Sequence, residues 1–257
     1  MPKLFCVSDI HGFYDELIEA LNKAGFDENN EEHFCIVLGD CFDRGDQPVE
    51  VMRYLNSLPR KVLVKGNHES LFQELCECGY PGSHDYSNGT YDTVCEFGNA
   101  GLGNIFDECC MVAYHKTKNF IDSMVDYFET KNYIFVHGWI PVTCKDGLPM
   151  YYRKNRKFEF APSWRYSHHS DWEQARWLNG IDMARNGFVE PEKTIVCGHW
   201  HCSYGHMIDG HTIDEFGPYA IWEPYYGNGV IAIDRCTAHT GKVNVLVLED
   251  EFLENTP

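Results

Sequence analysis

The sequence predicts an α/β fold whose sheet carries a polar edge. Five short apolar runs are each followed at once by a loop of Gly, Asp, His or Asn. Short continuous apolar runs bounded by glycine are typical of strands that are buried on both faces. Helical patterns separate several of these runs, and alternating strands and helices indicate an α/β sheet.

Each of the five predicted strands ends next to Asp, His or Asn residues, which can bind metal ions or transfer protons. In chain order they cover residues 3–8 before DIHG, 34–38 before GDCFDRGD, 62–65 before GNHE, 133–136 before HGW and 194–197 before GHWH. Ligands of open α/β sheets bind beyond the carboxyl ends of the strands. We therefore expect the five polar loops to meet at one edge and to form the functional site.

Helical spacing of apolar residues accounts for part of the chain between the strands. Three segments show it: Leu17 to Leu21, Val49 to Leu55, and Ile121 to Phe128. Near the other end of the chain, the pattern GVIAIDRCTAHTGKVNVLVLED predicts two strands joined by a turn that contains Thr240 and Gly241.

We expect a single domain over residues 1–257, because the chain shows no internal repeat and no linker of low complexity. Two segments differ from the strand-loop pattern. Residues from about 70 to 132 are long and mixed in character, and they predict a partly helical insertion. Residues from about 141 to 192 hold the basic and aromatic stretches YYRKNRKFEF and SWRYSHHSDWEQARW, and they predict a segment that covers the site.

The charge balance limits the partners. The chain has 39 acidic against 21 basic residues and a net charge of −18 at pH 7, which disfavours nucleic acid and anionic membranes. No signal-peptide core and no apolar run of membrane-spanning length is present, which favours a cytoplasmic protein. The 12 cysteines lack the paired CxxC spacing of zinc sites and are expected to be reduced thiols. Oligomeric state is left open.

Carboxylate, amide and imidazole groups follow every predicted strand. Asp9 and His11 alternate in an extended segment, so both side chains can point to the same ion. The other candidates follow the later strands: Asp40, Asn67, His137, His199 and His201. This mixture of ligands, with no required thiolate, suits Mn²⁺, Fe or Zn²⁺. A single D-x-H pair often only caps a turn, but five such clusters in order make chance a poor explanation.

Taken together, DIHG, GDCFDRG, GNHE, His137 and GHWH resemble the motifs of the calcineurin-like metallophosphoesterase superfamily. They span Asp9 to His201, which is most of the chain. The full DRG and GNHE forms are similar to the branch that holds serine/threonine protein phosphatases and symmetrical bis(5'-nucleosyl)-tetraphosphatases, in its compact bacterial and phage members. The resemblance implies a β-sandwich flanked by helices, in α/β/β/α layers, with a dinuclear metal site at the carboxyl ends of the strands.

The resemblance also implies which residues hold the metals. One divalent ion would be held by Asp9, His11 and Asp40. The second would share Asp40 as a bridge and be held by three later residues: Asn67, His137 and His199. His201 would be a further ligand of the first ion, as in members with a G-H-x-H motif, whereas eukaryotic-type protein phosphatases lack this histidine. Mn²⁺ is the first expectation for both ions, with Fe, Zn²⁺ or Ni²⁺ as alternatives.

This set of metal ligands can support the hydrolysis of a phosphoester. Two cations roughly 3.5–4 Å apart can share a hydroxide, lower its pKa and bind phosphoryl oxygens, so that the hydroxide attacks phosphorus in line. Arg44 would grip the phosphoryl oxygens with two parallel hydrogen bonds. His68 would protonate the leaving oxygen as general acid, with Asp43 orienting its imidazole.

Substrate binding is expected to use Asn67, Arg44 and a second arginine. Arg176 is favoured as the second arginine because of its helix-like DWEQARW setting, and Arg165 is the alternative. Either of them equally suits a surface position against an aromatic side chain.

The expected function is metal-dependent phosphoester hydrolysis. The Cys-x5-Arg loop, the D-x-D nucleophile motif and the P-loop are all absent from the sequence, which disfavours the other phosphatase mechanisms. A phosphoserine or phosphothreonine protein is the first expected substrate. The alternative is a symmetrical dinucleoside tetraphosphatase that releases two ADP. A homologue that binds metal without catalysis comes third, because every catalytic position is filled.

Overall fold

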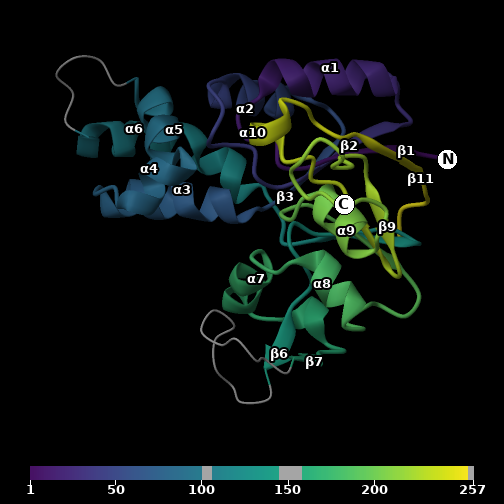
Figure 1. The fold of residues 1–257 in the computed structure, drawn as a ribbon. Helices are drawn as coiled ribbons and strands as arrows, with labels where there is room; N and C mark the ends of the chain where they lie inside the picture. The colour runs from purple at the N-terminus through teal and green to yellow at the C-terminus, as the bar shows by residue number, and fades with distance from the viewer. Residues whose placement is uncertain (100–105, 145–157, 254–257) are drawn as a thin grey trace.

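The structure of the chain is a computed structural model that describes residues 1–99, 106–144 and 158–253. Within these residues, two β-sheets face each other and helices cover their outer sides (Figure 1). All five strands predicted from the apolar runs are present. The stretch 151–157, which holds most of the basic run, lies outside the described residues.

The first sheet has the strand order β11-β1-β2-β3. Its strands are β1 (Lys3–Val7), β2 (His33–Leu38), β3 (Lys61–Val64) and β11 (Leu246–Glu249). The first three are parallel, and β11 pairs with β1 in the antiparallel sense. Phe5 and Val7 pack under helices while Leu4 and Cys6 face the second sheet, as the two-residue period of a strand requires.

The second sheet has the strand order β4-β5-β8-β10-β9. Its strands are β4 (Phe128–Glu129), β5 (Tyr133–Phe135), β8 (Thr194–Cys197), β9 (Tyr225–Gly227) and β10 (Val230–Ala232). The inner strands β5, β8 and β10 are parallel, and the edge strands are antiparallel to them. Phe135 and Val196 pack against the first sheet, whereas Ile134 and Ile195 pack against helices on the other side.

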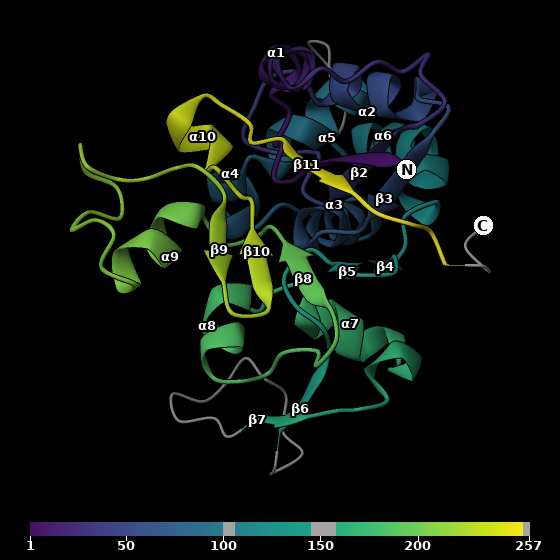
Figure 2. The same cartoon turned by 90° about the vertical axis from the view of Figure 1, so that its right-hand side faces the viewer.

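Helices form the two outer layers (Figures 1 and 2). The first sheet is covered by α1 (Tyr14–Ala24), α2 (Pro48–Ser57), α3 (Asn67–Cys78), α5 (Thr90–Gly98) and α6 (Phe106–Asp122). The second is covered by α7 (His169–Ala175), α8 (Gly180–Arg185) and α9 (Cys202–Ile208). The predicted α/β/β/α layering is therefore confirmed. None of the described helices combines the length and the apolar character that a membrane span needs.

Shorter elements complete the two segments outside the strand-loop pattern. Residues 70–132 hold most of α3 together with α4 (Ser83–Asn88), α5 and α6, and Figure 1 shows these helices gathered beside the first sheet. Residues 141–192 hold a small sheet of β6 (Val142–Cys144) and β7 (Phe158–Phe160), a 3-10 turn (Trp164–Tyr166), α7 and α8.

The helix predicted over Ile121 to Phe128 is wrong. Helix α6 ends at Asp122 because the following residues pair with β3, the edge strand of the first sheet. Val125 donates its N–H to the carbonyl of Leu63 and accepts the N–H of Lys65, each at 2.9 Å. Satisfying the open edge of the sheet outweighs the helical spacing of the side chains.

The predicted C-terminal strand pair does not form a hairpin. Strand β10 belongs to the second sheet and β11 to the first, so the chain crosses between sheets. The intervening segment contains α10 (Thr237–Thr240), and Gly241 ends this helix in a left-handed conformation with φ of 60°.

Candidate metal centre

The predicted site residues leave their strands through strained backbone. Six of them have φ angles between 50° and 72°: Asp9, His11, Asp40, Asp43, Arg44 and His199. This left-handed region costs a non-glycine residue on the order of 1–3 kcal/mol and persists only where the surroundings enforce it. Among the described non-glycine residues, only Asn99 and Cys236 share it. Backbone strain is therefore concentrated at the strand ends that the sequence singled out.

Two glycines let the strand ends approach each other. Gly39 has φ of 79°, and a Cβ added there would lie 2.5 Å from the backbone of Gly66 and 2.8 Å from Nδ1 of His137. A Cβ added at Gly66 would lie 2.2 Å from Oδ1 of Asp40. Any side chain at these positions would push the second and third strand ends apart, so packing requires both glycines.

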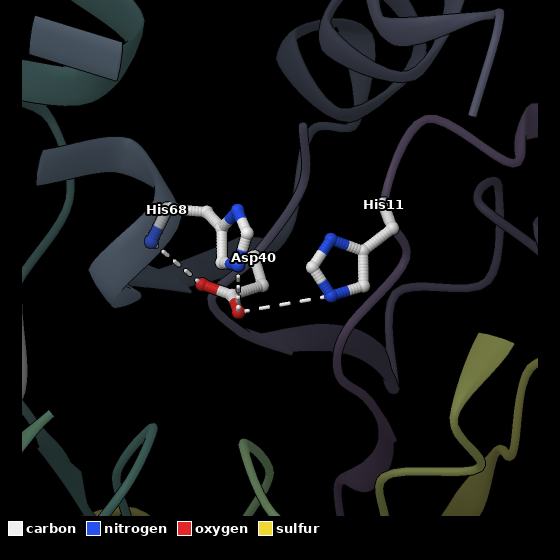
Figure 3. A group of neighbouring side chains, drawn as sticks. All are labelled: His11, Asp40 and His68. Carbon is white, nitrogen blue, oxygen red and sulfur yellow. Dashed lines mark hydrogen bonds and ion pairs between the residues drawn. The ribbon is translucent and has the colours of Figure 1, made fainter. Parts of the chain in front are cut away.

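The buried carboxylate of Asp40 lies at the centre of the site. Its Oδ1 accepts the backbone N–H of His68 at 3.0 Å and lies 3.3 Å from Nε2 of His137. Its Oδ2 lies 3.8 Å from Nε2 of His11 and 3.9 Å from Nε2 of His68, and Figure 3 shows the carboxylate between these two rings. Asp40 thus belongs to two groups that can hold a metal ion: His11, Asp40 and His68, and Asp40, His137 and His199.

The group around His137 fits a cation on chemical grounds. Nδ1 of His137 donates to the carbonyl of Leu38 at 2.6 Å, so Nε2 carries the lone pair of the neutral ring. This Nε2 lies 2.8 Å from Oδ1 of Asn67 and 3.3 Å from Oδ1 of Asp40. Three acceptors that converge in a buried place repel one another unless a cation or a proton lies between them. The ring of His199 packs edge-on against His137 at 5.1 Å and completes the group.

The group around His11 also presents hydrogen-bond acceptors to a place where a cation can bind. Nδ1 of His11 is bonded to the carbonyl of Phe42 at 2.9 Å, which leaves Nε2 as an acceptor. The guanidinium of Arg44 contacts this Nε2 at 3.0 Å and Nε2 of His68 at 3.2 Å. Because a guanidinium only donates, both imidazole nitrogens accept from it. The nitrogen that His11 would offer to a metal is therefore already oriented toward positive charge.

Two of the predicted ligands contact other groups. Oδ2 of Asp9 accepts the backbone N–H of His199 at 2.9 Å, which ties the first strand end to the fifth. His201 is hydrogen-bonded to Glu215 at 2.7 Å between Nε2 and Oε1. Neither Asp9 nor His201 belongs to the two groups found among the described residues, while His68, predicted as an acid, does.

His68 lies in a chain of hydrogen bonds that fixes its ring. Nδ1 is bonded to Oδ2 of Asp43 at 2.6 Å, and the same oxygen accepts the hydroxyl of Thr90 at 2.7 Å. Oγ1 of Thr93 accepts the backbone N–H of Asp43 at 3.1 Å. Asp43 thus contacts His68 directly, and helix α5 of the residue 70–132 segment holds Asp43 in place.

Burial and neighbouring charges set the protonation states. Burial lowers the pKa of His68, but the carboxylates of Asp40 and Asp43 outweigh it, so the pKa lies above its usual value. Burial also lowers the pKa of His137, yet Asp40 raises it to about 9. For His199, burial and then the charge of His137 lower the pKa to about 3. Burial opposes the charge of Asp40, but the imidazoles, His137 first, hold its pKa well below the usual range.

Two supporting carboxylates were missed at the sequence level. Glu69 is fully buried and accepts backbone N–H groups from Gly66 (2.9 Å), Asp40 (3.0 Å) and the residue after Asp40 (2.7 Å). These hydrogen bonds join the end of β2 to the start of α3. The GNHE motif contained Glu69, but no pattern indicated that its side chain turns back to β2. Asp234, which follows β10, is buried as well, and burial raises its pKa to about 8.

Both candidate arginines for the second phosphate contact have carboxylate partners. Arg176 is 3% exposed and its guanidinium contacts Asp126 and Ser70, while its Nε has no hydrogen-bond partner. Arg165 forms two hydrogen bonds with Glu129, at 2.9 Å and 2.6 Å. Arg165 therefore belongs to an ion-pair network with Glu129 and Glu190, and Arg176 contacts α3 through Ser70.

Comparison with known proteins identifies the class to which this fold and site belong. The model of the calcineurin-like phosphoesterase family matches residues 2–203, and the chain belongs to this family of metal-dependent hydrolases. The resemblance inferred from the motifs is thereby confirmed.

The relatives that match in sequence include proteins named as tetraphosphatases and as protein phosphatases. A symmetrical bis(5'-nucleosyl)-tetraphosphatase of Buchnera aphidicola subsp. Baizongia pistaciae is 38% identical over 66 residues, 25% of this chain and 23% of that protein. Serine/threonine-protein phosphatase 2 of Salmonella typhimurium is 36% identical over 95 residues, 36% of this chain and 42% of that protein. The chain therefore matches less than half of the length of these relatives.

Solved structures share the fold. The cold-active protein-tyrosine phosphatase of a psychrophilic Shewanella species is 18% identical, with a TM-score of 0.55, and the alignment covers 97% of this chain and 76% of that one. At this identity the likeness concerns the fold alone.

Proposed function

We propose that the chain hydrolyses phosphoesters at a centre of two divalent cations. The observation that carries this proposal is Asp40, whose two oxygens face two different groups of imidazoles. One cation is assigned to Asp9, His11 and Asp40, with His201 as a further candidate ligand. The other is assigned to Asp40 and to three later residues: Asn67, His137 and His199. When bound, the cations, Mn²⁺ first among the candidates, supply Lewis acidity that activates water and binds phosphoryl oxygens.

Side chains of the protein supply the positive charge that binds the phosphoryl oxygens and the proton that the leaving oxygen takes up. Arg44 lies between His11 and His68 with its terminal nitrogens directed into the site, and it is assigned to grip phosphoryl oxygens at two points. Nδ1 of His68 is fixed on Asp43, so Nε2 is the nitrogen that faces the site. In this structure Nε2 accepts from Arg44, and the raised pKa of His68 favours a proton on Nε2 once Arg44 turns to a phosphoryl oxygen, which suits a general acid for the leaving oxygen.

Substrate contacts complete the assignment. Asn67 is assigned to bind substrate as well as metal. Arg176 is assigned as the second phosphate arginine, which requires its guanidinium to exchange Asp126 for a phosphoryl group. Its unpaired Nε supports this assignment, because a buried unpaired donor gains a hydrogen bond when an anion arrives.

Two substrate classes are candidates. The full DRG and GNHE motifs fit both classes, and the phosphatase relative supports a phosphoserine or phosphothreonine protein as the first candidate. A symmetrical dinucleoside tetraphosphate follows from the tetraphosphatase relative and from the aromatic surface described below. The net charge of −18 weighs against nucleic acid. A cytoplasmic location is also proposed, because eleven of the cysteines are free thiols in the structure.

The proposal is tested by hydrolysis assays on Mn²⁺-loaded protein with p-nitrophenyl phosphate, a phosphoserine peptide and diadenosine tetraphosphate. Phosphoester hydrolysis should stop when a chelator is added and return with Mn²⁺. A metal-loaded protein that cleaves none of the three would contradict the proposal. Phosphate released from the peptide supports a protein phosphatase, and ADP as the only nucleotide product supports symmetrical cleavage of the tetraphosphate.

A further inference from the structure

An aromatic cluster lies on the connection between α9 and β9. Phe216 and Trp222 belong to this connection and His239 belongs to α10, and we call these three residues the aromatic triad. The ring centroids are 5.9 Å apart for Phe216 and Trp222, 5.6 Å for Phe216 and His239, and 5.5 Å for Trp222 and His239. His201 packs against the triad, with its ring 4.7 Å from Phe216.

The triad is open to solvent although its rings are large. Phe216 is 50% exposed, His239 is exposed and Trp222 is partly buried. The rings meet at 55°, 84° and 44°, so none of the three pairs is stacked face to face. Aromatic rings that contact one another at an angle and remain exposed can still stack on a flat ligand.

The connection that carries the triad is held by specific contacts. The buried side chain of Asn244 donates to the carbonyl of Trp222 at 2.7 Å. Glu215 binds His201 at 2.7 Å, and Asp214 accepts the N–H of Tyr219 at 3.1 Å. Exposed aromatic rings on an anchored connection form a surface that is preformed for binding, so little conformational entropy is lost when a ligand arrives.

The triad is linked to the metal centre through Trp200. The ring of Trp200 lies 6.2 Å from His199 of the metal centre and 5.8 Å from His201, against which the triad packs. Figure 2 shows α10 and the α9–β9 connection on the same flank of the molecule. A ligand with a phosphoryl group at the metal centre can therefore extend toward the triad.

We propose that the aromatic triad binds the nucleobase of a nucleotide substrate whose phosphate chain lies at the metal centre. This inference rests on the proposed function and names its substrate class. The connection also carries Asp214, Glu215 and Glu223, which repel phosphate but can accept a hydrogen bond from a base. Glu223 adjoins Trp222 and its side chain is 68% exposed. A neutral, flat base with an exocyclic amino group, such as adenine, matches both the rings and these acceptors.

A binding measurement tests the inference independently of turnover. The affinities of Mn²⁺-loaded protein for ADP and for pyrophosphate, which lacks the base, are compared by calorimetry. ADP should bind more tightly, and Phe216→Leu should weaken ADP binding by roughly 5- to 150-fold, the range measured for loss of one stacked base. Tyr226→Leu is the matched control, because Tyr226 is a 62% exposed aromatic residue on β9 outside the triad. Equal affinity for ADP and pyrophosphate, or equal losses in both variants, overturns the inference.

A kinetic measurement separates the inference from the proposed function. Phe216→Leu should lower kcat/KM for diadenosine tetraphosphate relative to that for glycerol phosphate by about tenfold or more, and Tyr226→Leu should leave the ratio unchanged. A selective loss of phosphopeptide turnover in Phe216→Leu would assign the triad to a peptide and overturn the inference. If wild-type protein cleaves glycerol phosphate but not the tetraphosphate, the proposed function stands and the inference fails. If it cleaves no phosphoester, the proposed function fails.

Discussion

At the scale of the residue, Asp40 shows how a strained position is fixed for chemistry. Its φ of 54° is unfavourable, yet each polar group of the residue has a partner. The N–H donates to Glu69 at 3.0 Å, the carbonyl accepts from His11 at 2.9 Å, and Oδ1 accepts from His68 at 3.0 Å. Because backbone and side chain are both tied, the carboxylate is oriented before any ligand arrives, which is the preorganisation that an electrostatic site needs.

The prediction at this scale concerns His68. His68→Asn should lower kcat for substrates with poor leaving groups by about 10²–10⁴-fold, because the proton donor is lost. The loss should be smaller for p-nitrophenyl phosphate, whose leaving group needs no protonation. Metal content, measured by elemental analysis, should stay near that of wild type, whereas Asp40→Asn should deplete both metals. Since His68 also lies within reach of Asp40 and His11, loss of metal from His68→Asn would instead make it a ligand.

At the scale of the element, α5 joins the site from a segment that the strand pattern does not include. Thr90 at its first turn and Thr93 both contact Asp43. Sequence reasoning could place Asp43 and His68, because each follows a predicted strand. It could not place Thr90, because a contact across 47 residues depends on how the helical segment packs. The same limit explains the error at Val125, where pairing with β3 overrides helical spacing.

The prediction at this scale is a variant of α5. Thr90→Val keeps the shape of the side chain but removes the hydroxyl that donates to Oδ2 of Asp43. Asp43 should then hold the ring of His68 less firmly, and kcat should fall by up to roughly 10- to 150-fold, the equivalent of one hydrogen bond to a charged group. The control is Thr117→Val, a buried threonine whose hydroxyl bonds within α6. If both variants lose the same activity, the effect reflects packing and not the link to Asp43.

At the scale of the whole molecule, the metal centre needs both sheets. His11, Asp40 and Asn67 follow strands of the first sheet, and His137 and His199 follow strands of the second. The order of the motifs predicted an α/β fold with the site at its strand ends, and the resemblance to the family implied the α/β/β/α layers. The pairing of the two sheets was not visible, because β10 and β11, adjacent in the chain, belong to different sheets. Contacts that tie the sheets together therefore control the shape of the centre.

Asp250 makes such a contact between the two sheets. The prediction at the scale of the whole molecule concerns the loss of its carboxylate. It follows β11 of the first sheet, and its carboxylate accepts the hydroxyl of Thr130 at 2.7 Å and the backbone and side-chain N–H groups of Asn132 at 2.8 Å and 2.6 Å, next to β4 and β5 of the second. Burial opposes its charge, but these hydrogen bonds hold the pKa of Asp250 below its usual value. A lowered pKa means that the stabilisation is complete above the unfolded value near ~3.9 and is lost as pH falls through the folded value.

Asp250→Asn should therefore lower the free energy of unfolding at pH 7 by about 1–3 kcal/mol, because an amide cannot accept all of these hydrogen bonds and one of its own donors meets a donor. Urea unfolding followed by circular dichroism between pH 7 and pH 3 measures the effect, and the difference from wild type should shrink below about pH 4, where the Asp250 carboxylate protonates first in the unfolded chain and then, at lower pH, in the folded protein. Asp122→Asn serves as control, since Asp122 pairs with Lys118 on the surface and its side chain is 49% exposed. Its loss should cost about 0.5 kcal/mol or less. A difference between Asp250→Asn and wild type that stayed constant over the whole pH range would show that the charge of Asp250 does not stabilise the junction of the two sheets.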